Sequence, residues 1–345
     1  MQDNQSALLA KPVSATPVLS VENLYVEFPV YKGAVKALNG VSLQVGPGEI
    51  VGLVGESGSG KSVCAMMGMQ LIPAESYRVK KGRIKLLDKE ILALSEKEMR
   101  AIRGHDMSMI FQEPMTALNP VMKVGRQIVS VILQHQAISK QQAKEKTLSL
   151  LRDMYIADPE QVFNSYPFEL SGGMRQRIMI ALAFSCEPQL LIADEPTTAL
   201  DVTVQKQVLL LLKERARKTG TAILLITHDM AVVSQFCERV YVMYAGSVVE
   251  EGKTYDVIHQ PRHPYTQGLL AGMPENARPG QTLKTITGQV PDLAQLPTGC
   301  SFMNRCERRI DICRQRPDAL PLKTDALHKV ACWVVKQEEE DNAKS

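Results

Sequence analysis

The first part of the chain alternates between apolar and polar residues in short segments that are separated by glycine and proline. Residues 18–28 alternate loosely, residues 41–45 alternate more clearly, and residues 50–54 are apolar without interruption. Alternation is typical of a strand with one exposed face, and a short apolar run between turns is typical of a buried strand. The pattern predicts an antiparallel pair that precedes a buried strand.

The middle of the chain changes from strand-like to helix-forming sequence. Residues 62–72 predict a helix, and helix-forming segments rich in Met and Gln run from residue 95 beyond residue 151. Strand-like runs return at residues 190–193 and 222–227, on either side of a predicted helix at residues 202–218. Strand, helix and strand in this order make a βαβ unit of a parallel sheet. We therefore expect an α/β domain over residues 18–262, with a helical subdomain inserted at about residues 100–188.

The two ends of the chain differ from this domain. Residues 1–17 are polar and contain two prolines, so we expect a flexible leader there. Beyond His259 prolines become frequent and the periodicity fades, which predicts a small separate unit over residues 263–345.

Composition narrows the class of protein. The chain has 345 residues, of which 45% are hydrophobic and 22% charged, enough to bury a sizeable core. Its longest apolar run, residues 178–184, is far shorter than the roughly 18 to 20 residues that a bilayer requires. A net charge of +3 is too slight to indicate nucleic-acid binding, which requires a concentrated basic face. We expect a globular protein that is neither secreted nor membrane-spanning and does not bind nucleic acid.

A glycine-rich motif directly follows the predicted buried strand. Gly55-Glu56-Ser57-Gly58-Ser59-Gly60-Lys61-Ser62 fits G-x-x-x-x-G-K-[ST] and leads into a predicted helix. In such a loop the backbone N–H groups and the helix N-terminus face phosphate oxygens. Lys61 would neutralise the β and γ phosphates, and the Ser62 hydroxyl would bind Mg²⁺. A chance glycine-rich turn is the alternative, which the strand-to-helix context disfavours.

Two carboxylates end the next predicted strand. In Leu190-Leu191-Ile192-Ala193-Asp194-Glu195, Asp194 is placed to hold Mg²⁺ and Glu195 to polarise the attacking water as a general base. His228 follows a further strand and could reach the γ-phosphate. Alone, such a pair is usually a solvated turn and such a histidine a surface residue, but here a phosphate-binding motif accompanies them.

A second helix N-terminus could bind an anion. Leu170-Ser171-Gly172-Gly173-Met174-Arg175-Gln176-Arg177 places a Ser-Gly-Gly turn before an apolar helix. One nucleotide does not need two such cradles from one chain. We therefore expect Ser171 and Gly173 to contact ATP held by a second protomer.

Together these motifs resemble the ATP-binding subunits of ABC transporters. The glycine-rich loop, Gln112 in Phe111-Gln112-Glu113-Pro114, residues 170–176, residues 190–195, Ala199-Leu200-Asp201 and His228 match that family's motifs in order, over about residues 18–260. The resemblance implies a P-loop ABC ATPase core with an inserted helical subdomain and a small C-terminal cysteine-rich extension.

The resemblance also implies roles for individual residues. Gln112 would contact the metal, take part in catalysis with Glu195 and His228, and link the metal to the helical subdomain. Asp201 would lie in a cross-dimer loop. The segment that contacts ATP in trans would comprise Ser171, Gly172, Gly173 and Gln176. For the aromatic side chain that stacks on adenine we choose Tyr31, with Tyr25 and Phe28 close by.

Further segments narrow the class to importers. Met115-Thr116-Ala117-Leu118-Asn119-Pro120 and residues 263–270 resemble the ATPases of oligopeptide and dipeptide uptake systems, most closely those of the D,D-dipeptide subgroup. The resemblance implies two permease subunits, a second ATP-binding subunit that is a paralogue, an external solute-binding protein, and a place on the cytoplasmic face of a bacterial inner membrane. The alternatives are a soluble ABC ATPase acting on DNA or ribosomes, and an importer of a non-peptide solute such as nickel.

Cysteines cluster near the C-terminus. Cys300, Cys306, Cys313 and Cys332 are separated by 5, 6 and 18 residues, whereas Cys64, Cys186 and Cys237 are spread over apolar helical segments and are expected to be buried thiols. A reduced cytosolic context favours metal over disulfides. Zinc, with His328 as a possible ligand, usually has a C-x-x-C knuckle, which is absent.

An iron–sulfur cluster fits the four clustered cysteines better, and the same arrangement in peptide importers supports [4Fe-4S]. Nearby arginines would compensate its negative charge: Arg305, Arg308, Arg309, Arg314 and Arg316. Zinc and four unmetallated thiols remain the alternatives.

Overall fold

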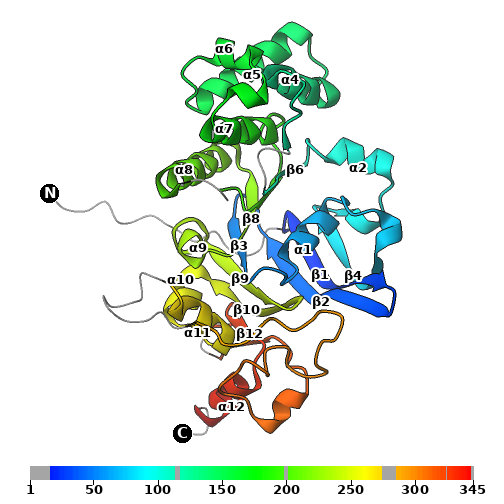
Figure 1. Cartoon of the computed structure of the whole chain (residues 1–345), viewed down its shortest axis with the longest axis vertical. Helices are drawn as coiled ribbons and strands as arrows, with labels where there is room; N and C mark the ends of the chain where they lie inside the picture. The colour runs from blue at the N-terminus through cyan, green and yellow to red at the C-terminus, as the bar shows by residue number, and fades with distance from the viewer. Residues whose placement is uncertain (1–15, 113–116, 198–200, 274–284, 324, 343–345) are drawn as a thin grey trace, which may run out of the picture.

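A mixed, mainly parallel sheet forms the centre of the fold in the computed structural model, which describes residues 16–112, 117–197, 201–273, 285–323 and 325–342 (Figure 1). The sheet has eight strands in the order β11-β12-β10-β9-β3-β8-β7-β6, and β9, β3, β8, β7 and β6 run parallel. The strands are β3 (Ile50–Val54), β6 (Met107–Ile110), β7 (Leu190–Asp194), β8 (Ala222–Thr227), β9 (Arg239–Tyr244), β10 (Ser247–Lys253), β11 (Leu320–Pro321) and β12 (Lys329–Val330).

A second, antiparallel sheet packs beside the first. Its strand order is β2-β1-β4-β5, and its members are β1 (Leu19–Val30), β2 (Gly33–Val45), β4 (Arg78–Leu86) and β5 (Lys89–Glu90). The pairing of β1 with β2 agrees with the antiparallel pair that the alternating sequence predicts.

Alternate residues of the central strands face two different hydrophobic cores. On β8, Leu224 and Ile226 pack into the core shared with the antiparallel sheet, whereas Ile223 and Leu225 pack into the core shared with the helices. Successive side chains of a strand point to opposite faces, so a strand covered on both sides must be apolar throughout. This is why residues 190–193 and 222–227 read as continuous apolar runs.

Helices surround the parallel sheet and form a separate group at one end of the long axis, the end opposite α12 (Figure 1). This group, the helical subdomain, consists of α4 (Val124–His135), α5 (Lys140–Asp153), α6 (Pro159–Asn164) and α7 (Gly172–Ala183). The other helices are α1 (Lys61–Gly68), α2 (Glu96–Ile102), α8 (Val202–Thr219), α9 (Met230–Phe236), α10 (Thr254–His259), α11 (Pro264–Ala271) and α12 (Trp333–Asn342). Short 3₁₀ turns occupy Ala74–Ser76, Ile91–Ala93, Pro167–Glu169 and Asp311–Arg314.

Local chemistry fixes where the helices of the subdomain begin and how they pack. The Ser139 hydroxyl accepts a hydrogen bond from the N–H of Gln142, and the Gln142 side-chain oxygen accepts one from the N–H of Ser139, a capping box that starts α5. Gly125 on α4 lies against the ring of Phe163 on α6, and a Cβ there would come within 2.2 Å of the ring. The two helices can approach this closely because residue 125 has no side chain.

One strand lies inside the segment that reads as helical. Residues 107–110 form β6 at the edge of the parallel sheet, paired with β7, so the sequence interpretation of helix from residue 95 onward is wrong there. Four residues, Met-Ser-Met-Ile, are too few for their apolar pattern to distinguish a strand from a helix. The helices of the subdomain begin beyond this strand.

The C-terminal extension, residues 263–345, is joined to the ATPase core rather than folded apart from it. Its strand β12 pairs with β10, and Tyr265, Leu270 and Phe302 belong to the hydrophobic core of the parallel sheet. Glu250 on β10 is buried and accepts hydrogen bonds from the backbone of Arg262 and His263 and from His328 Nε2 at 2.7 Å. The separate unit that fading periodicity predicts is therefore a segment that shares the main core.

Among the helices that the structure describes, none is long and apolar enough to cross a membrane.

Candidate nucleotide site

The register of the parallel strands brings the predicted catalytic motifs to one edge of the sheet. Val54 at the end of β3 pairs with Thr227 at the end of β8, and Asp194 at the end of β7 pairs with Ile226. The residues that follow these strand ends are therefore neighbours. Carboxyl ends of parallel strands are a common place for ligand sites in α/β folds.

In the glycine-rich loop after β3, a side chain at Gly55 or Gly60 would collide with neighbouring backbone atoms. Gly55 has φ 153°, and a Cβ there would lie 2.1 Å from the carbonyl oxygen of Met243 on β9. Gly60 has φ 100° and precedes α1, and its Cβ would lie 2.6 Å from the carbonyl oxygen of Ala37. Gly58 also has a positive φ, 77°, but open space around it. The loop is therefore held against β9 and β2 by close backbone approach.

Lys61 is buried beneath this loop. Its ammonium donates hydrogen bonds to the carbonyl oxygens of Gly55 at 2.7 Å and Glu56 at 2.9 Å. Burial lowers the pKa of Lys61, and the negative charges of Glu195, Asp194 and Glu56 oppose that shift. A cation in this position is suited to phosphate oxygens, which would offer it stronger acceptors than carbonyl groups.

Asp194 and Ser62 fit a hard cation. The Ser62 hydroxyl lies close enough to the Asp194 carboxylate to lower its pKa, and Asp194 Oδ1 is buried with no hydrogen-bond partner among the described residues. Burial and the neighbouring charge of Glu195 raise the pKa of Asp194. A nearby cation would oppose this rise, because it stabilises the ionised carboxylate. Mg²⁺ is commonly held by one or two protein oxygens together with phosphates, so this pair meets its requirement.

Three of the predicted catalytic side chains form one hydrogen-bonded row. Gln112 Nε2 donates to Glu195 Oε2 at 2.9 Å, and His228 Nδ1 lies 3.0 Å from Glu195 Oε1. The backbone N–H of Glu195 donates to Ile226 on β8 at 2.9 Å, and Glu195 adopts φ 46°. A left-handed conformation in a non-glycine residue is strained and is often found at functional sites. The structure thus brings together residues that lie far apart in the sequence.

The signature segment divides into an exposed start and a buried helix. Ser171 caps α7 by accepting a hydrogen bond from the N–H of Met174 at 3.3 Å, and both Ser171 and Gly172 are exposed, with Gly173 half-buried. Gln176 is fully buried and donates to the carbonyl oxygen of Pro196. Its position does not agree with the expected contact to a second nucleotide; it links α7 to the loop that follows Glu195.

Other predicted nucleotide contacts lie on the surface. Asp201 caps α8 by accepting a hydrogen bond from Val204 N at 2.9 Å, while Ala199 and Leu200 of the same motif lie outside the described residues, as do residues 113–116. Tyr31, at the turn between β1 and β2, is 98% exposed. The two other aromatic candidates are engaged: Arg316 lies over the Tyr25 ring and Phe28 contacts Tyr77.

The isolated cysteines are buried, and the four clustered ones are half-buried or buried. Burial, together with the neighbouring thiols of Cys313, Cys332 and Cys306, raises the pKa of Cys300 to about 11, so the four thiols lie within electrostatic reach of one another. Yet among the residues that the structure describes, no group of three or more His, Cys, Asp or Glu side chains is arranged to hold a metal ion.

Several side chains expected near the four clustered cysteines pair with other residues instead. His328, the possible zinc ligand, bonds to Glu250. Arg308 pairs with Glu338, and Arg305 pairs with Glu56 in the glycine-rich loop. Sequence reasoning missed this last contact; its only signal is that Arg305 directly precedes a clustered cysteine.

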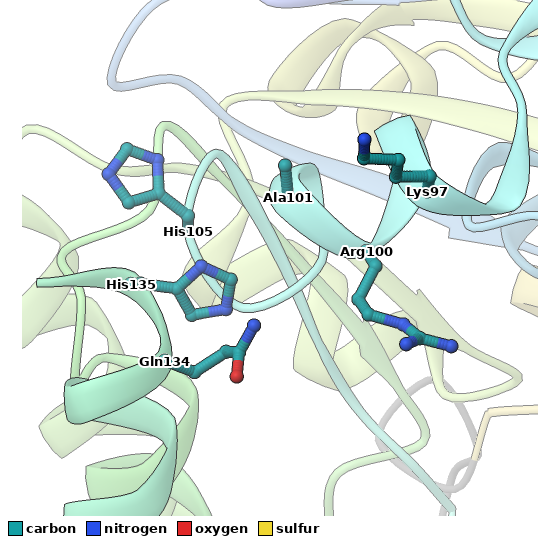
Figure 2. A pocket seen from close by; sticks show the side chains of 6 residues that line it. All are labelled: Lys97, Arg100, Ala101, His105, Gln134 and His135. Carbon is teal, nitrogen blue, oxygen red and sulfur yellow. The ribbon is translucent and has the colours of Figure 1, made fainter.

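A cleft of about 430 Å³ lies away from this row, between α2 and the end of α4 (Figure 2). Its lining comprises Lys97, Arg100, Ala101, His105, Gln134 and His135. The rings of His105 and His135 lie 5.8 Å apart, and burial together with the charge of His105 lowers the pKa of His135. No residue of the glycine-rich loop lines this cleft, so it is distinct from the nucleotide site.

Comparison with known proteins agrees with the fold and the motifs. The ABC transporter family model matches residues 38–198, and the model of the oligopeptide/dipeptide transporter C-terminal region matches residues 249–313. A dimeric ATP-binding cassette solved in a post-hydrolysis state with ADP and Pi is 28% identical, with a TM-score of 0.60 over 68% of this chain and 98% of that chain. The structure of cbiO1 from Clostridium perfringens, part of an ABC transporter complex, is 26% identical with a TM-score of 0.60, over 71% of this chain and 91% of that one. The class of protein is therefore an ABC transporter ATPase.

Curated relatives define the family. The probable D,D-dipeptide transport ATP-binding protein DdpD of Escherichia coli is 59% identical over 93% of this chain and 98% of its own length. The dipeptide transport ATP-binding protein DppD of Bacillus subtilis is 49% identical over 94% of this chain and 96% of its own.

This chain belongs to the oligopeptide/dipeptide transporter family of ABC ATP-binding proteins, and it is the ATP-hydrolysing subunit of an importer of that class. Membership implies transmembrane permease subunits, a paired ATP-binding subunit, a solute-binding protein and a peripheral place at the cytoplasmic face of the inner membrane. The expected α/β P-loop fold, ATPase activity and importer class are confirmed.

The geometry of the glycine-rich loop makes a specific prediction. Replacing Gly55 by Ala forces a Cβ against the Met243 carbonyl and should displace the loop, weakening binding of a fluorescent ATP analogue by more than ~100-fold. Gly58→Ala, which meets a positive φ but no neighbouring atom, is the matched control and should cost less than ~10-fold. Equal losses in the two variants would contradict the close-approach explanation.

Proposed function

We propose that this chain binds MgATP at the glycine-rich loop and hydrolyses it with Glu195 as general base, and that this reaction drives uptake of D,D-dipeptides through separate permease subunits. The observation that carries the catalytic part is the row of Gln112, Glu195 and His228 beside Asp194 at the strand ends. Two hydrogen bonds fix the Glu195 carboxylate while leaving it 15% exposed, so it is oriented and still open to water.

Each residue of the row has a distinct role in this proposal. Glu195 accepts a proton from the attacking water. His228 uses Nδ1 to hold Glu195, and its other ring nitrogen can reach the γ-phosphate. Gln112 connects Glu195 to the segment that leads into the helical subdomain, so it can report the state of the site to that subdomain.

The remaining site residues hold the nucleotide. Lys61 neutralises phosphate charge, and Ser62 with Asp194 holds Mg²⁺, which supplies electrostatic stabilisation of the transferred phosphoryl group. The loop's backbone N–H groups and the N-terminus of α1 cradle the phosphates. Tyr31 is the candidate for stacking on adenine because its side chain is exposed on the surface.

The proposed solute comes from similarity alone. The E. coli relative at 59% identity is named a probable D,D-dipeptide transport protein, and others are named for dipeptides and oligopeptides. An ATP-binding subunit does not contact the solute, so no side chain here selects it. Identifying the solute retained by the co-purifying solute-binding protein tests this part; retention of nickel instead of a D,D-dipeptide would contradict it.

Replacing Glu195 by Gln should separate binding from hydrolysis. The amide keeps the shape of the side chain but cannot take a proton, so turnover by the assembled transporter, with the partner ATPase also disabled, should fall more than ~100-fold while ATP binding persists. Glu187→Gln makes the same change at an exposed carboxylate away from the row and should leave turnover unchanged. Wild-type turnover in Glu195→Gln would exclude Glu195 as the base.

We further propose that Ser171, Gly172 and Gly173 complete the ATP site of a paired subunit, itself a paralogue, with Asp201 in the loop between the two subunits. The exposed N-terminus of α7 supports this arrangement, because it can receive an anion from another molecule. A related cassette was solved as a dimer with ADP and Pi.

The shared site predicts different effects on the two subunits. Ser171→Arg should abolish hydrolysis at the partner's nucleotide without weakening photo-crosslinking of labelled ATP to this chain, and Lys61→Ala should do the reverse. Ser139→Arg removes a comparable helix cap from α5 at a cost of about 1 kcal/mol and should change neither signal. Loss of labelling on the mutated chain itself in Ser171→Arg would exclude the arrangement in trans.

A [4Fe-4S] cluster held by Cys300, Cys306, Cys313 and Cys332 is the proposed metal centre of the extension, with zinc as the alternative. The mutual influence of the four thiols supports it. Their described arrangement is not a preformed site, so binding requires the side chains to turn toward a common centre.

Anaerobic preparation tests the cluster directly. The protein should be brown, absorb broadly near ~400 nm and contain about four irons per chain. Cys306→Ser and Cys313→Ser should bleach it and loosen residues 295–335, whereas Cys186→Ser, at a buried thiol outside the group, should keep the colour. Stoichiometric zinc in place of iron would exclude the iron–sulfur cluster and favour the zinc alternative. Absence of any metal would mean that the four cysteines are ordinary thiols.

A further inference from the structure

The extension reaches into the glycine-rich loop through an ion pair. Arg305 donates from Nη1 to Glu56 Oε2 at 2.7 Å and from Nη2 to Glu56 Oε1 at 3.1 Å. Glu56 is the second residue of the loop, and the two partners are 249 positions apart in the chain. A bidentate pair between a guanidinium and a carboxylate is among the stronger and more directional contacts in proteins.

Arg305 is positioned before it meets Glu56. Its Nε donates to the carbonyl oxygen of Thr287 at 3.0 Å, and its guanidinium lies 5.8 Å and 5.9 Å from the ring centroids of Tyr244 and Phe302. Only 6% of the Arg305 side chain is exposed. Because these neighbours already restrict the guanidinium, it loses little conformational entropy when it binds the carboxylate.

The same loop residue is also held through its backbone. The N–H of Glu56 donates to the hydroxyl of Tyr265 on α11 at 2.8 Å, and Tyr265 is fully buried against Tyr244. Both the main chain and the side chain of Glu56 are therefore fixed by residues that lie outside the predicted nucleotide motifs.

The charge of Glu56 matters because of where it lies. Its carboxylate acts on the ammonium of Lys61, and its carbonyl oxygen accepts from the same ammonium at 2.9 Å. A carboxylate without a counter-charge at a phosphate cradle repels the anionic ligand that the cradle must bind.

We propose that Arg305 is a positioning residue of the nucleotide site, which neutralises Glu56 and so allows the glycine-rich loop to bind phosphates tightly. The extension is then part of the ATP site. The inference rests on the proposed binding of ATP at this loop, and it assigns a role to residues that no motif of the ATPase core contains.

Nucleotide affinity in a series of charge variants tests the proposal. The net charge of the pair is zero in the wild type, −1 in Arg305→Met, +1 in Glu56→Gln and zero in the double variant. We expect the Kd of a fluorescent MgATP analogue, measured on the full chain, to rise about tenfold in Arg305→Met and to fall about threefold in Glu56→Gln. The double variant should return to within about threefold of the wild type.

A purely structural role predicts a different order. If the pair only holds the fold together, both single variants and the double variant bind more weakly, and that result overturns the proposal. Should Arg305→Met fail to fold, Arg305→Lys, which keeps the charge and loses the bidentate fork, is expected to show a smaller loss. A loss in Arg305→Lys of about tenfold, the size expected when the charge itself is removed, would also overturn it.

Two controls separate this inference from the proposed function. Arg308→Met removes a neighbouring arginine that pairs with Glu338 instead of the loop and should leave the Kd unchanged. Lys61→Ala should abolish binding if the loop is the ATP site. An unchanged Kd in Lys61→Ala would exclude the loop as the ATP site and with it the proposed function. If Lys61→Ala abolishes binding and Arg305→Met leaves the Kd unchanged, only the role of Arg305 is excluded.

Discussion

The parallel pairing of β3, β8 and β7 is the constraint on which the nucleotide site depends. Because Val54 pairs with Thr227 and Asp194 with Ile226, the loop after β3, Glu195 after β7 and His228 after β8 leave the sheet at the same level. A shift of one residue in any pair would exchange the two faces of that strand between the two cores. The buried apolar residues that set the register therefore also set the distances among the proposed catalytic side chains.

Much of this site could be predicted because its motifs are local. The glycines of residues 55–60, the Asp-Glu pair at a strand end and the Ser-Gly-Gly turn each carry their chemistry within a few residues, and the strands around them read clearly. Met107–Ile110 could not be recognised as a strand, because its identity comes from pairing with β7 and not from its own four residues.

Contacts between segments that are far apart in the chain could not be predicted from the sequence. Gln176 has the spacing of a surface contact, yet the fold buries it beneath Pro196. Glu56 reads as a variable position of a phosphate loop, yet Arg305 and Tyr265 both hold it. Such pairings depend on how the C-terminal segment lies on the core, which no periodic pattern encodes.

The attachment of the C-terminal segment also determines what happens if the cassette is taken without it. Ending the chain after residue 262 would remove His263 and His328, two of the three residues that satisfy the buried Glu250, and would uncover the edge of β10 where β12 now pairs. A buried carboxylate that has lost two of its three donors and an unpaired strand edge favour unfolding and self-association, respectively. The ATPase core of this protein is thus not a transferable module: in evolution or by engineering, exchanging its C-terminal segment requires β10 to change with it.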